Sequence, residues 1–182
     1  MLSKKRKTVG RSFRVDEEWL NVLVEESQKQ GISVNSILNR LLQQYAYLRF
    51  MLRFGAITLT RKGFVGILEC CPDDKITENG LNAGSAIVKD LLLTMGVTPN
   101  YAFVLCLVKK LLAEFSGWFE CDHHIKEDKE ILHLRHELGM KWSLYLSGVA
   151  TGTFNSILDK QVIVEHTDSS VTITIPKADK QI

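Results

Sequence analysis

The sequence predicts an α+β protein in two parts, and three observations predict it. Residues 12–15 alternate polar and apolar side chains, as a strand does. Residues 17–50 repeat apolar side chains every three or four positions on both sides of Gly31, as two helices do. From residue 56 onward, runs typical of hairpins alternate with longer helical patterns.

The ends of the first two helices are marked in the sequence. Asp16 is placed to cap the first helix, and Glu17 and Glu18 favour the positive end of its dipole. Gly31 should end that helix, and Ser33 is placed to cap the second. One strand has two unpaired edges, and so small a core is marginal, so we expect this unit to dimerise.

This segment resembles the ribbon-helix-helix DNA-binding domains of the MetJ/Arc/CopG class. The shared features are the strand SFRV, the acidic helix start DEEW and the turn GISVNS. In that class two chains pair their strands antiparallel, and the ribbon enters the major groove of double-stranded DNA. The resemblance covers about a quarter of the chain. It implies a homodimeric, sequence-specific transcriptional regulator with no catalytic step. Repression is the simpler mode of regulation, because a dimer bound at a promoter obstructs polymerase.

The resemblance also assigns roles to individual residues. Ser12 and Arg14 would face bases, with Arg11 as an addition at the start of the strand. Phe13 and Val15 would point into the dimer core. The start of the second helix would hold a DNA phosphate, since exposed amides at a helix start bind anions. The residues there are Ser33, Val34 and Asn35.

Charge is concentrated at the same end of the chain. Residues 1–50 hold nine Lys or Arg against five acidic residues, whereas the whole chain carries a formal net charge of only +2. A polyanion would bind here. The basic run before the strand is Lys4, Lys5, Arg6 and Lys7. Taken alone, this run could equally well be a solvated tail. Because it precedes a strand that resembles a groove-reading ribbon, we interpret it as an arm that contacts phosphates.

The chain is expected to divide into a DNA-binding and dimerisation domain, 1–54, and an α+β domain, 55–182. In the second domain we expect hairpins over 57–60 and 64–70, 118–124 and 130–138, and 161–166 and 170–176. Helices are expected over 81–95, 101–115 and 139–158, with a loop over 72–80. Six strands in three hairpins favour an antiparallel sheet covered by helices on one face.

The second domain resembles no family that we can name. Attached to a DNA-binding dimer, it should either sense a small-molecule effector or assemble dimers into a higher homo-oligomer. A cavity between helix and sheet could hold an apolar or aromatic ligand. Gly148 and Gly152 indicate a closely packed helix instead of a phosphate loop.

The middle hairpin contains residues that could bind a metal. If its turn spans 126–129, then Cys121, His123 and His136 lie on one face of the sheet. Thiolate and imidazole are ligands that zinc or nickel accepts. The spacing is not the compact one of a zinc finger, and hydrogen-bonded sheet histidines explain the same residues. We therefore predict no metal and no other cofactor, and keep these three only as an alternative.

Composition and motifs restrict the function further. No apolar run approaches the roughly 20 residues that cross a bilayer, so we expect no membrane partner and a cytoplasmic protein. Phosphate-binding glycine loops are absent. An antitoxin-type autoregulator that binds a partner protein is the alternative, although residues 56–175 look folded where such tails are short and disordered. An enzyme would instead show a deep polar pocket with convergent titratable groups.

Overall fold

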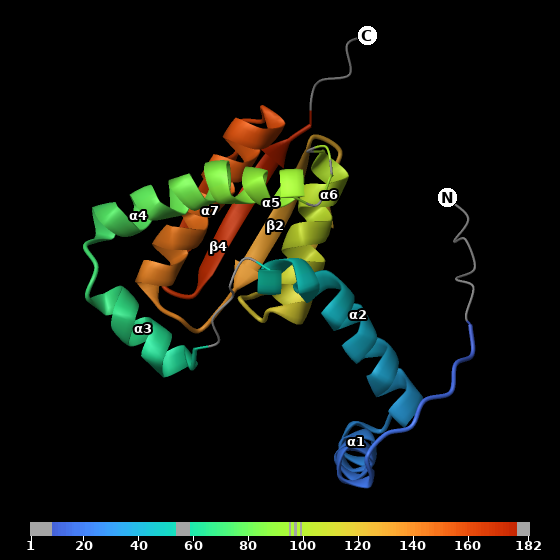
Figure 1. The fold of residues 1–182 in the computed structure, drawn as a ribbon. Helices are drawn as coiled ribbons and strands as arrows, with labels where there is room; N and C mark the ends of the chain where they lie inside the picture. The colour runs from blue at the N-terminus through green and yellow to red at the C-terminus, as the bar shows by residue number, and fades with distance from the viewer. Residues whose placement is uncertain (1–8, 54–58, 95, 97, 99, 178–182) are drawn as a thin grey trace. The chain divides into compact units, whose positions relative to one another are not determined.

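The computed structural model describes residues 9–53, 59–94, 96, 98 and 100–177. As predicted, the fold is α+β with an antiparallel sheet, but the sheet of the described residues has four strands instead of the six expected (Figure 1). The chain forms two compact units, Met1–Ala46 and Tyr47–Ile182. Within the described ranges, no helix combines the length and the apolar character that crossing a membrane requires.

Both predicted helices of the first unit are present, and the second continues into the second unit. They are α1 (Glu17–Gln30) and α2 (Val34–Arg53). Gly31 ends α1 in the left-handed conformation, with φ of 64°. Ser33 caps α2 as predicted, because its Oγ accepts a hydrogen bond from the Ser36 amide at 3.1 Å. Asp16 holds the N-cap position of α1, but its side chain makes no capping hydrogen bond.

No strand is assigned over residues 9–16, the segment that contains the predicted strand. A strand is defined by hydrogen bonds to a neighbouring strand, and the predicted neighbour belongs to a second copy of the chain. The backbone of Asp16, at the end of the segment, is extended. The ribbon therefore stays a prediction.

The described part of the second unit contains four strands and helices of very different lengths. The helical segments are α3 (Arg61–Glu69), α4 (Asp73–Asn82), the π-helical η1 (Ala83–Ile87), α5 (Val88–Thr94), α6 (Tyr101–Cys106), the π-helical η2 (Leu107–Phe115) and α7 (Met140–Leu158). The strands are β1 (Glu120–Ile125), β2 (Lys129–Arg135), β3 (Ile163–Thr167) and β4 (Ser170–Pro176), in the spatial order β1-β2-β4-β3. Helix α7 connects β2 to β3, and the last hairpin then returns β4 to lie beside β2.

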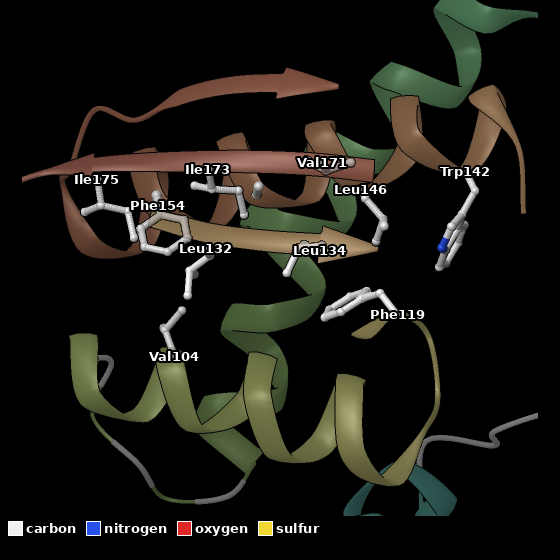
Figure 2. Packing of buried hydrophobic residues seen from close by; sticks show 11 residues of the cluster. Val104, Phe119, Leu132, Leu134, Trp142, Leu146, Phe154, Val171, Ile173 and Ile175 are labelled. Carbon is white, nitrogen blue, oxygen red and sulfur yellow. The ribbon is translucent and has the colours of Figure 1, made fainter. Parts of the chain in front are cut away.

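The middle and last hairpins lie where they were predicted, to within a few residues, and the middle hairpin also has the predicted register. His124 pairs with Ile131, as a turn over 126–129 requires. Alternate residues of β4 are buried, so the core lies on one face of the sheet. Helices α6 and α7 supply the other side of this core, which Figure 2 shows. Its buried members are Val104, Phe119, Leu132, Leu134, Trp142, Leu146, Ala150, Phe154, Val171, Ile173 and Ile175.

The hairpin predicted over 57–60 and 64–70 is wrong, because residues 61–69 form helix α3; residues 57 and 58 lie outside the described ranges. Thr60 caps α3, its Oγ1 accepting from the Gly63 amide at 3.2 Å. Phe64 and Leu68, four positions apart, pack against the core, and the Phe64 ring meets Trp142 edge-on at 5.1 Å between centroids. A short apolar run fits a strand or a helix, and helical spacing was the correct interpretation.

The loop predicted over 72–80 is also wrong, because residues 73–82 form helix α4. Asp73 and Asp74 occupy its first turn, where the helix dipole favours acidic side chains. Its buried positions are Ile76 and Gly80. A helix that buries one large apolar side chain and a glycine leaves almost no hydrophobic period in the sequence.

Helix α4 and segment η1 pack against α7 through four glycines, and Figure 1 shows these elements side by side. Gly80 and Gly84 face Gly148 and Gly152. A Cβ at Gly148 would lie 2.7 Å from the carbonyl oxygen of Thr77, closer than side chains approach backbone. The prediction of close packing at Gly148 and Gly152 is therefore confirmed.

Candidate nucleic-acid interface

The predicted base-reading residues lie in the extended segment that precedes α1. Ser12, Arg14 and Arg11 are all exposed. Among the residues that the structure describes, neither arginine has a hydrogen bond or ion pair. Both guanidinium groups are therefore available to an external partner, and guanidinium suits the paired acceptors of phosphate or guanine.

The predicted phosphate site lies at the first turn of α2. The hydroxyl of Ser33 is engaged in capping, since it also lies 2.9 Å from the Ser36 hydroxyl. Val34 is half-buried and Asn35 is exposed. The first amides of a helix lack partners within it, so this turn can bind an anion through its backbone. The predicted arm, Lys4, Lys5, Arg6 and Lys7, lies outside the described residues.

The first unit leaves most of its apolar side chains uncovered. Among its described residues only Ser27 and Ile37 are buried. Ten large apolar side chains expose between 39% and 67% of their surface. They are Val9, Phe13, Val15, Trp19, Leu20, Val22, Ile32, Leu41, Leu42 and Tyr45. So many exposed apolar side chains on a unit of this size indicate a surface, which we call the uncovered apolar face, that is suited to a protein partner.

No protein-family model, curated protein or solved structure matches the chain. Its function is therefore inferred from two features of its own residues. One is the pair of unpaired arginines before α1, and the other is the uncovered apolar face of the first unit.

The alternative metal ligands are engaged separately. His123 Nε2 lies 2.8 Å from Glu130 Oε2, whereas His136 Nε2 lies 3.0 Å from the hydroxyl of Ser143. Cys121 is half-buried, and burial raises the pKa of its thiol, which disfavours the thiolate that metals bind. The described part of the chain contains no group of three His, Cys, Asp or Glu residues that could hold a metal. The structure does not bring the three candidates together.

His123 instead belongs to a half-buried cluster that joins α6 to the sheet. Tyr101 of α6 donates a hydrogen bond to Glu130 Oε2 at 2.8 Å, and His123 approaches the same oxygen. Burial by itself raises the pKa of Glu130, but the hydrogen bonds from Tyr101 and His123 more than offset burial, so the pKa is lowered. The cluster therefore stabilises the folded chain while Glu130 is ionised.

This cluster predicts a pH dependence of stability. Because the folded pKa of Glu130 is below its ordinary value, its contribution to stability is complete above that ordinary value and is lost as pH falls through the folded pKa. Glu130→Gln should cost about 1–2 kcal/mol of unfolding free energy at pH 7 and flatten the decline between about pH 5 and pH 3. Denaturant unfolding across that range measures it. Parallel pH curves for the two proteins would contradict the assignment.

The second unit also has a cavity of about 580 Å³ with charged, histidine and apolar residues in its wall, which makes it the candidate for an enzyme site. Its charged wall residues pair with one another: Arg61 with Glu137 at 3.0 Å, and Arg135 with Glu120 at 3.0 Å. His136 lines it, but the serine beside that histidine, Ser143, has no exposed surface and donates to the Thr167 carbonyl at 2.6 Å. A buried hydroxyl held in this way is not accessible to a substrate, so the pair does not form a nucleophilic site.

Proposed function

We propose that this chain is a sequence-specific DNA-binding transcriptional regulator that acts in the cytoplasm as a homodimer, with paired N-terminal segments reading the major groove. The observation that carries the proposal is the uncovered apolar face of the first unit, which includes Phe13 and Val15 of the exposed segment that carries Arg14. A second copy is the partner that would cover this face and pair the segment at the same time.

Base reading falls to the side chains on the outward face of the paired segments. Arg14 would donate two hydrogen bonds to a guanine, and Ser12 and Arg11 would flank it. The first turn of α2 would bind a backbone phosphate and fix the register, while the basic arm adds affinity without sequence preference. A dimer bound at a promoter obstructs polymerase, which makes repression the simpler outcome.

Arg14→Ala tests base reading. A preferred duplex is first selected from a random pool with the full chain, and binding is then followed by fluorescence anisotropy on that duplex and on random DNA. Arg14→Ala should cost about 1–3 kcal/mol on the selected duplex and much less on random DNA. Lys4→Ala should weaken binding to the selected duplex and to random DNA by similar factors, and it should reduce the salt dependence of both affinities.

The matched control is Arg61→Ala, which removes an exposed arginine from the second unit. It should leave both affinities unchanged. Equal losses on selected and random DNA from Arg14→Ala would remove its base-reading role. Failure of the full chain to enrich any duplex would overturn the proposed function itself.

A further inference from the structure

The second unit contains a mainly apolar cavity of about 350 Å³, within the range of small-molecule sites. Its walls come from η1 and α5, from η2, from α7 and from Trp118. Seven of its ten wall residues are apolar, among them Val88, Leu107 and Val149. Each wall residue belongs to the described part of the chain and to the second unit.

Two of the walls are π-helical, which is rare in globular proteins. π-helical turns are found mostly as single-turn bulges, frequently at functional sites. In η2, Leu107 and Leu111 are turned to the cavity together with their neighbour Leu112. Such a turn gives up regular α-helical hydrogen bonding, and here both instances border the same space.

The few polar groups of the wall restrict what can bind. The Tyr145 hydroxyl and the Trp118 indole N–H have no hydrogen-bond partner within the described residues. Both groups can donate, and burial raises the pKa of Tyr145, so its hydroxyl keeps its proton. The remaining polar wall residue is the carboxylate of Asp90, and no wall residue is basic. An acceptor oxygen is therefore favoured and an anion is disfavoured.

Helix α2 packs against two residues of the cavity wall. Leu48, near the end of that helix and within the second unit, packs against Leu107 and Leu111. Helix α2 begins in the first unit, where its first turn is the candidate phosphate site. A ligand that moved η2 would change the packing of Leu48 and so bias the helix that both units share.

We propose that this cavity is the effector site of the regulator: it takes an uncharged, mostly apolar molecule with one hydrogen-bond acceptor, and its occupancy changes DNA affinity through α2. The regulatory part rests on the proposed DNA-binding function. Binding of the molecule itself does not.

Three naphthalene probes of one shape test the cavity by calorimetry with the full chain. Acetylnaphthalene should bind; ethylnaphthalene, without the acceptor, should bind about fivefold more weakly, and naphthoate at least tenfold more weakly. Tyr145→Phe should weaken acetylnaphthalene about fivefold and leave ethylnaphthalene unchanged. Ethylnaphthalene is the internal control for this variant, because it has no acceptor for the Tyr145 hydroxyl.

Ile87→Trp narrows the cavity from its rim without disturbing the core, since Ile87 is 63% exposed. It should abolish acetylnaphthalene binding. The matched control is Leu93→Trp, because Leu93 is equally exposed on α5 but lies outside the cavity wall. This variant should bind acetylnaphthalene as the unmodified chain does. Absence of binding to the unmodified chain overturns the site. If Ile87→Trp but not Leu93→Trp changed the oligomeric state measured by sedimentation, the cavity would be a contact site for a second copy of the chain. That result would also overturn the proposed small-molecule site.

The regulatory part is measured separately, as the effect of acetylnaphthalene on affinity for the selected duplex. A change of at least threefold is expected, and Leu48→Ala should reduce it while both binding events persist. Binding of the probe without any change in DNA affinity would overturn the regulation. Loss of DNA binding before any probe is added would instead overturn the proposed function, and calorimetry would still report on the cavity.

Discussion

Gly152→Ala should destabilise the second unit by about 3 kcal/mol, although alanine is the better helix former. A Cβ at this position would lie 2.5 Å from the carbonyl oxygen of Leu81 and 3.0 Å from the amide nitrogen of Ser85. Both are backbone atoms, so relief requires α7 to move away from α4 and η1. That movement loosens the packing on which Ala150 and Phe154, on the same helix, depend. Denaturant unfolding of the full chain measures the loss.

Gly66→Ala is the matched control. Gly66 lies inside helix α3, where an added Cβ would meet nothing within 4 Å. The same change should therefore stabilise the chain by about 0.5–1 kcal/mol through lower backbone entropy of the unfolded state. If both substitutions changed stability in the same direction, the close approach of the helices would not be what fixes glycine at position 152.

The elements that could be predicted from the sequence are those whose pattern is local. Alternation together with the polar turn over 126–129 gave the β1–β2 register, and Gly31 and Ser33 marked the turn between the first two helices. Helix α4 was missed because its contact with α7 is made by backbone, through Gly80, and not by a stripe of large apolar side chains. Gly148 and Gly152 indicated half of this contact, but its other half lay in a predicted loop.

The candidate sites differ in the same way. Arg14 and Ser33 could be chosen as candidates because the roles proposed for them depend on neighbours in sequence. The apolar cavity could not, since Tyr145 and Leu111 are brought together only by tertiary packing. The spacing of Leu107 and Leu111 signals an apolar helix face but not what that face encloses. His123 and His136 show the opposite case. The sequence placed both on one face of the sheet, but in the structure they contact different partners, Glu130 and Ser143.

Phe13→Asp should abolish both dimerisation and specific DNA binding. Phe13 is 62% exposed in the single chain, and in the proposed dimer it faces the partner's helices beside Val15. A carboxylate there is desolvated in both copies at once, which costs on the order of 3 kcal/mol for each copy. The two copies together lose about 6 kcal/mol, so the dimer dissociation constant should rise about ten-thousandfold. Since two paired segments are needed to read the groove, affinity for the selected duplex should fall to that for random DNA.

Sedimentation equilibrium and anisotropy on the same preparations distinguish this from a general loss of folding. Ile163→Asp is the matched control, because Ile163 is 61% exposed on β3 of the second unit. It adds the same charge to the chain, so it also controls for weaker attraction to DNA, and it should leave the dimer and the selected duplex affinity within about twofold. A Phe13→Asp protein that stays dimeric would mean that another surface joins the two copies. The uncovered face of α1 and α2 would then need a different occupant, and Arg14 would have no paired segment from which to read bases.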